Sequence, residues 1–152
     1  MFGEKEKISV YLGGDHAAFE AKGKLKDFLD AEGYHTTDLG TFSEDSIDYP
    51  DISREVGEKV VENKNSFGIL LCGSGVGVCM AANKIRGVRA ALANNEELAE
   101  MSRKHNNANI LTMGARMSSQ EDMNKIALKF LTTAFEKDHE RHVRRVKKLT
   151  EM

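Results

Sequence analysis

The chain has 152 residues, of which 40% are hydrophobic and 30% charged, and one domain of this size can bury a sizeable core. This composition excludes a disordered protein, and the formal net charge of −2 excludes a global field that would attract nucleic acid or an anionic membrane. Residues 1–7 are charged, no apolar run approaches the roughly 18 residues of a membrane span, and two cysteines make no disulfide framework. We therefore expect one cytoplasmic domain over residues 1–152.

Strands and helices alternate from the start of the chain. Residues 8–12 predict a strand that ends at Gly13 and Gly14, and residues 19–32 predict a helix. Residues 34–39 predict a second strand, and a polar loop over 40–48 follows it. A helix then begins near Pro50, and its apolar face is expected to carry Ile52, Val56, Val60 and Val61.

The alternation continues in the second half. Residues 67–72 form a continuous apolar run, which is typical of a central parallel strand covered on both faces. The next predicted elements are a helix over 78–84, a strand over 88–93, a helix over 96–104, a strand over 109–113 and a helix over 119–135 that Ser119 caps. Residues 138–149 predict a last helix, whose narrow apolar stripe of Val143, Val146 and Leu149 indicates docking on the domain or on a second subunit.

Regular βα alternation predicts an α/β fold: one Rossmann-like three-layer αβα domain with a parallel sheet of roughly five strands and a C-terminal helix. Ligands of such folds bind at the carboxyl ends of the strands, near the point where the strand order reverses. The turns that follow the strands are therefore the expected place of a functional site.

The glycine-rich turn after the central strand is the strongest local signal. Gly73, Gly75 and Gly77 leave successive backbone N–H groups unobstructed where a helix begins, which favours binding of an anion. The competing interpretation is a dinucleotide fingerprint, but Val78 stands where the third glycine of that motif belongs. An oxyanion or phosphate site is the better prediction.

Cys72 ends the strand directly before this turn. The same N–H groups and helix dipole would stabilise a thiolate, so a reactive cysteine is one interpretation of Cys72, and a buried strand residue is the other. Cys79 lies within the following helix among apolar residues and is expected in the core.

Three further groups of residues have a functional and a purely structural interpretation. Asp15 and His16 follow the first strand and are either a helix cap or part of the ligand edge. His105 ends a helix and either complements its dipole or acts as a general acid or base. Arg141 and Arg145 share one helical face at a spacing of four and are either a solvated basic face or a phosphate clamp.

The chain resembles the type B ribose-5-phosphate isomerase family, which includes galactose-6-phosphate isomerase subunits. The resemblance extends over residues 8–149. The motifs that carry it are Gly14-Asp15-His16, Asp48-Tyr49-Pro50, the run over 69–77, Ala81-Ala82-Asn83-Lys84, Arg103-Lys104-His105-Asn106, Asn109-Ile110-Leu111, Gly114-Ala115-Arg116 and the tail from Arg141 to Arg145.

The resemblance implies a role for each matching residue. Cys72 would remove the proton from C2 of an open-chain aldose, Ser74 would pass protons to the substrate oxygen, and His105 would open the sugar ring with Asp15 nearby. The implied substrate-binding residues are His16, Tyr49, Gly73, Gly75, Val76, Gly77, Asn106, Arg116, Arg141 and Arg145. Phosphate would be held by His16 and the three arginines of this set, and some of these groups would come from a second subunit.

The expected reaction is interconversion of ribose 5-phosphate and ribulose 5-phosphate through a cis-enediolate, in the non-oxidative pentose phosphate pathway. An allose-6-phosphate isomerase or a galactose-6-phosphate isomerase subunit is the nearest alternative, and a dinucleotide-binding oxidoreductase is a remote one. We expect no cofactor, no metal and no nucleic-acid or membrane partner. The expected assembly is a homodimer with a shared active site, and a tetramer is the alternative. The histidines show no close ligand spacing with cysteine or carboxylate in the sequence.

Overall fold

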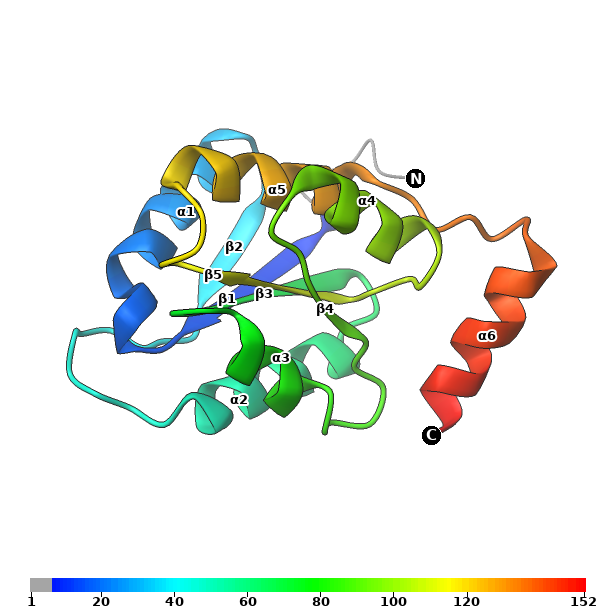
Figure 1. Ribbon diagram of the computed structural model, residues 1–152, viewed down its shortest axis with the longest axis horizontal. Coiled ribbons are helices and arrows are strands. Elements are labelled where there is room, and N and C mark those ends of the chain that lie inside the picture. Colours follow the sequence, from blue (N-terminus) through cyan, green and yellow to red (C-terminus); the bar gives the residue numbers. More distant parts are fainter. Residues whose placement is uncertain (1–6) are drawn as a thin grey trace.

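The computed structural model describes residues 7–152, which form a five-stranded parallel sheet with helices on both faces (Figure 1). Residues 1–6, part of the charged N-terminal segment noted above, lie outside the described residues. The strands are β1 Ser9–Gly14, β2 His35–Asp38, β3 Ser66–Cys72, β4 Ala90–Leu92 and β5 Ile110–Gly114. The helices are the 3-10 helix η2 His16–Ala18, α1 Phe19–Ala31, α2 Tyr49–Glu62, α3 Val76–Ala82, α4 Glu96–Lys104, α5 Gln120–Thr132 and α6 Glu140–Glu151.

The helices make two layers around the sheet. Helices α1, α4 and α5 cover one face, α2 and α3 cover the other, and α6 projects from the side of the domain (Figure 1). Strand β3 is buried on both faces, because Ile69 and Leu71 belong to one core cluster and Leu70 and Cys72 to the other. This explains its continuous apolar sequence and confirms the three-layer prediction. Within the described part of the chain, no helix combines the length and apolar character needed to cross a bilayer.

The strand order places a ligand cleft at one defined point. The order is β2-β1-β3-β5-β4, so the chain reverses direction across the sheet between β1 and β3. The two strands end together, since Gly14 pairs with Leu71 and the Asp15 N–H donates to the Leu71 carbonyl at 3.1 Å. Residues that follow β1 and β3 are therefore neighbours at the switch point, where open α/β sheets bind ligands.

Some sequence expectations are wrong in detail. The first strand does end at Gly14, but both glycines belong to it, and a Cβ at Gly13 would lie 2.7 Å from Val56 Cγ2. Helix α3 begins at Val76, two residues earlier than expected. Val61 is 43% exposed instead of facing the core, and Gly57 is buried in α2 against Ile85.

Other local expectations are confirmed. The Asp122 N–H donates to Ser119 Oγ at 3.1 Å, so Ser119 caps α5 as expected. On α6, Val146 is buried, whereas Val143 and Leu149 are exposed by 40% and 46%. The apolar stripe of α6 is thus only partly covered by its own domain.

A buried lysine ties α1 to β2 and to the loop that follows. Lys22 is 1% exposed, and its Nζ donates to Asp38 Oδ1 and to the Thr41 carbonyl, both at 2.6 Å. Lys22→Ala should lower the free energy of unfolding by about 3 kcal/mol, because it leaves Asp38 without its cation. Denaturant unfolding measures this, with Lys24→Ala, which removes an exposed ion pair to Glu20, expected to change stability by less than about 1 kcal/mol. Equal effects of the two substitutions would contradict the role of Lys22.

Candidate active site

The cleft at the switch point contains the cysteine that the sequence singles out. Cys72 is the last residue of β3, and its side chain lies in a cleft of about 350 Å³. The residues that line the cleft are Asp15, Tyr49, Cys72, Gly73, Ser74, Gly77, Arg116 and Met117. Seven of these eight were predicted from the sequence, and Met117 was not.

The glycine turn presents one amide to the Cys72 sulfur. The Gly75 N–H donates to Cys72 Sγ at 3.1 Å, and Gly75 has φ +82°, a conformation that L side chains rarely adopt. Thr112 Oγ1 donates to the Gly75 carbonyl at 2.9 Å and fixes the turn from β5. An N–H aimed at the sulfur stabilises a thiolate, so this geometry supports the reactive interpretation of Cys72.

The turn also positions a hydroxyl and an aromatic ring. Ser74 Oγ accepts the Val76 N–H at 3.2 Å, which orients the hydroxyl beside the cleft. The Tyr49 ring lies against Gly77, where a Cβ would be 2.8 Å from ring carbons. Glycine at this position therefore lets Tyr49 form one wall of the cleft.

The turn after β1 supplies an acid and an imidazole. Asp15 is buried, and its Oδ1 accepts the Ala17 N–H at 3.0 Å, so the expected cap exists and also lines the cleft. His16 lies next to it without lining the cleft, and its Nδ1 accepts the Ile47 N–H at 3.3 Å. A neutral His16 then carries its proton on Nε2, which is left as a donor.

Arg116 brings a positive charge to the same place. The Arg116 N–H donates to the Gly73 carbonyl at 3.0 Å, and a Cβ on Gly73 would lie 3.2 Å from Arg116 Nη1. The guanidinium thus packs over the glycine turn. Among the described residues it has no recorded carboxylate partner, which suits it to an anionic ligand.

Four predicted site residues lie away from the cleft. His105 and Asn106 follow α4 and precede β5, at the amino edge of the sheet, and Arg141 and Arg145 are exposed on α6. Cys72 pairs with Gly114 at the far end of β5. Because β5 spans four residue steps, the two edges are about 13 Å apart along the strand. Within one chain, His105 and Asp15 are therefore not neighbours.

The sequence as a whole matches the family model described as Ribose/Galactose Isomerase over residues 10–149. The chain belongs to this family. Ribose-5-phosphate isomerase B of Mycolicibacterium paratuberculosis is 41% identical over 145 residues, which cover 95% of this chain and 91% of that protein.

Solved structures of the Ribose/Galactose Isomerase family agree with the fold. A ribose 5-phosphate isomerase of Thermotoga maritima superposes with a TM-score of 0.91 at 43% identity, covering 95% of this chain and 99% of that one. Ribose-5-phosphate isomerase B of Mycoplasma genitalium, solved with bound ribulose-5-phosphate, also has a TM-score of 0.91, at 38% identity and 96% coverage of both chains. These relatives are sugar-phosphate isomerases, so they favour this function over dinucleotide binding at the glycine turn.

In this member of the family, His105 has a carboxylate partner that the sequence did not predict. His105 Nε2 lies 3.5 Å from Glu136 Oε1, and the Glu136 N–H donates to the Lys104 carbonyl at 3.1 Å. Glu136 lies in the segment that connects α5 to α6, where no helix pattern draws attention to it. The expectation that the histidines show no close ligand spacing with a carboxylate is therefore wrong, because Glu136 lies three residues before His139 and six before His142.

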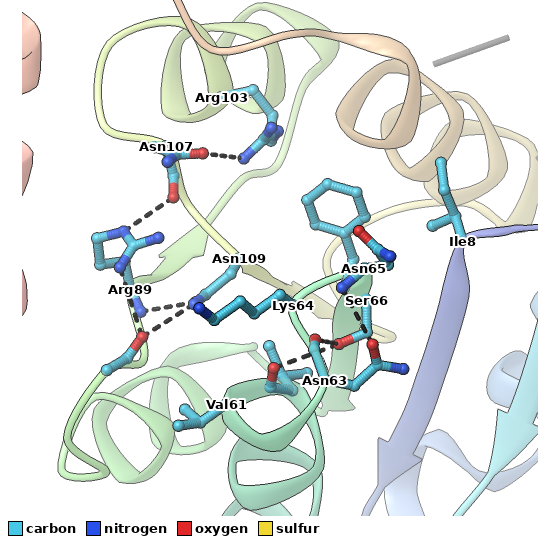
Figure 2. A pocket seen from close by; sticks show the side chains of 13 residues that line it. Ile8, Val61, Asn63, Lys64, Asn65, Ser66, Arg89, Arg103, Asn107 and Asn109 are labelled. Atoms are coloured by element: carbon cyan, nitrogen blue, oxygen red, sulfur yellow. Dashed lines mark hydrogen bonds between the residues drawn. The ribbon is translucent and has the colours of Figure 1, made fainter. Parts of the chain in front are cut away.

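A second, larger pocket lies at the amino edge of the sheet, and its charged side chains have a structural role. It has a volume of about 530 Å³, and Figure 2 shows Arg89 and Arg103 on one side of it. Arg89 Nε donates to the Asn107 carbonyl at 2.9 Å, and Arg103 Nη1 donates to Asn107 Oδ1 at 2.8 Å. Burial, with a smaller effect of Arg89, lowers the pKa of Arg103 to about 10, so Arg103 stays charged at neutral pH. The two arginines thereby hold the loop that carries His105.

Proposed function

We propose that the chain interconverts ribose 5-phosphate and ribulose 5-phosphate through a cis-enediolate, as the non-oxidative branch of the pentose phosphate pathway requires. The observation that carries the proposal is the Gly75 N–H aimed at Cys72 Sγ inside a cleft that also holds a hydroxyl and a guanidinium. The ribulose-5-phosphate bound to the Mycoplasma genitalium relative supports this choice of substrate.

Proton transfer follows from the groups in the cleft. The Cys72 thiolate removes the C2 proton of the open-chain aldose, the C–H electrons form the C1=C2 double bond, and the negative charge moves to O1. Free N–H groups of the turn over 73–77 stabilise this oxygen, a stabilisation that is strongest in the transition state. Ser74 Oγ then relays the O2 proton to O1, and Cys72 returns its proton to C1, which leaves the C2 carbonyl of the ketose.

Phosphate binding requires more cations than one cleft contains. Arg116 lies over the glycine turn and His16 has Nε2 available, but the exposed Arg141 and Arg145 belong to α6, which projects from the side of the domain (Figure 1). We infer that two chains pair so that α6 and the loop with His105 and Asn106 of each chain complete the cleft of the other. Ring opening by His105 with Asp15 then takes place across the dimer interface.

Exposed apolar side chains favour this pairing. Val76 and Met80 on α3 are exposed by 42% and 65%, and Met117 beside the cleft by 66%. On α6, the exposed part of the apolar stripe offers Val143 and Leu149. Burial of such surfaces between two chains would release water from both and would hold α6 against the partner's cleft. Further association of dimers into a tetramer would need another surface.

The function is tested by a coupled isomerase assay of the purified chain without added metal. Ribose 5-phosphate, allose 6-phosphate and galactose 6-phosphate are compared at equal concentrations, and ribose 5-phosphate is expected to be turned over fastest. Turnover of a hexose phosphate alone, or turnover that needs another chain, would assign the protein to the alternative branch of the family.

Single substitutions of the α6 arginines should weaken substrate binding more than turnover. Arg141→Ala or Arg145→Ala each removes charge-assisted hydrogen bonds worth about 1.5–3 kcal/mol, which raises KM by about 10- to 100-fold. The phosphate is charged in the substrate and in the transition state alike, so kcat should change little. Steady-state kinetics measure both constants, with Arg144→Ala as the control on the same helix. A KM unchanged in both variants would favour a merely solvated basic face.

A further inference from the structure

Three potential metal ligands converge at the start of α6. Glu136, His139 and His142 follow one another at intervals of three residues, and one ligand atom from each lies within 4.8 Å of the other two. Glu136 Oε2 is 3.0 Å from His139 Nε2, and the His139 and His142 rings stack with centroids 5.3 Å apart. We propose that Glu136, His139 and His142 form a binding site for a divalent transition-metal ion, with Zn²⁺ as the best match.

The donor set and its spacing suit Zn²⁺. Two imidazoles and one carboxylate are a common three-residue zinc set, and a water molecule completes the tetrahedron. Ligand atoms on one tetrahedral ion lie about 3.4 Å apart, given metal–ligand bonds of about 2.0–2.1 Å. The Glu136–His139 pair is already within this distance. The other ligand atoms are at most 4.8 Å apart, so closing the site needs a side-chain movement of about 1.4 Å at most. Rotation of the exposed His139 side chain and of the half-buried His142 side chain supplies a movement of this size.

His142 has the properties of a ligand that lacks its ion. Its Nδ1 is enclosed, and within residues 7–152 it has no hydrogen-bond partner. Desolvation, followed by the charges of His105, His139 and Arg141, lowers the pKa of His142, although Glu136 opposes this. An ion would supply the partner that this ring nitrogen lacks.

Metal binding would also act on His105. Glu136 Oε1 is 3.5 Å from His105 Nε2, and the His105 and His142 rings are 4.7 Å apart. An ion bound to Glu136 neutralises the carboxylate that faces His105, or it recruits His105 as a fourth ligand. Either event removes His105 from ring opening, so a bound ion should inhibit the isomerase. This inhibition rests on the proposed function, whereas the metal binding does not.

Calorimetric titration with Zn²⁺ tests the site in the full-length chain. One ion per chain is expected to bind, and the double variant His139→Ala/His142→Ala should lose at least about tenfold in affinity. His35→Ala, which removes an exposed histidine of β2, is the matched control and should bind as the unmodified chain does. Co²⁺ in place of Zn²⁺ should give a visible spectrum with nitrogen and oxygen ligands and without thiolate charge-transfer bands.

The same experiments can overturn the proposal. Unchanged Zn²⁺ affinity in the double variant, or thiolate bands in the Co²⁺ spectrum that disappear in Cys72→Ala, would show that the ion binds at the cysteine instead. Inhibition is measured as the isomerase rate with Zn²⁺ divided by the rate without it. This ratio is expected to be below one for the unmodified chain and near one for the double variant. Equal ratios in the two proteins would contradict the effect on His105.

Discussion

Cys72→Ala is expected to lower kcat by about three orders of magnitude or more, because it removes the group that we propose to carry the proton between C2 and C1. Substrate binding should persist, since Arg116, His16 and the backbone amides of the turn are untouched. Steady-state kinetics measure the loss of turnover, and calorimetry with ribose 5-phosphate measures the retained binding. Loss of C2 proton exchange in deuterated water would locate the defect at the proton-transfer step.

Cys79→Ala is the matched control for this substitution. Cys79 lies on α3 outside the cleft, and its thiol donates to the Ala90 carbonyl at 3.6 Å. Removal of this weak bond should leave kcat within about twofold, because the residue touches no group of the cleft. If Cys72→Ala kept near-normal activity, the C2 proton would have to be removed by another residue, and Asp15 would be the nearest candidate in the cleft.

The sequence predicted a strand or helix correctly wherever a single local pattern determines its type and its start. The apolar run that ends at Cys72 predicted a central strand, and Ser119 caps the helix that begins after it, as its position predicted. The pattern failed at Val61, which was expected on the apolar face of α2 and is 43% exposed. Gly57 is buried in that helix instead, against Ile85, and such a long-range contact leaves no trace in the local sequence.

The residues of the cleft could be predicted more completely from the sequence than the rest of the site. Asp15 and Cys72 each follow a strand, and parallel strands bring such residues to one edge. The position of His105 depends instead on the length and direction of α4, which returns the chain to the opposite edge of the sheet. Glu136 lies in a connection between helices, where only its three-residue spacing to His139 marks it. The resemblance implied both His105 and Cys72 for one site, and the fold of one chain keeps them apart.

Mixing two inactive variants should therefore restore activity. Cys72→Ala lacks the base, and the double variant Arg141→Ala/Arg145→Ala should lose about 100-fold or more in kcat/KM through its missing phosphate anchors. In a dimer with one chain of each kind, the cleft that keeps Cys72 receives its arginines from the chain that keeps Arg141 and Arg145. One of the two clefts is then intact.

The amount of restored activity distinguishes a shared site from a site within one chain. Random pairing makes half of the dimers mixed, and half of their clefts are intact, so about a quarter of the original kcat/KM should return. Co-expression of the two variants, or refolding of an equal mixture, is assayed at substrate concentrations below KM. If each chain completed its own cleft, no combination of these two variants would contain an intact site, and activity would stay at the level of the separate proteins. Recovery therefore requires that α6 of one chain reach the glycine turn of another.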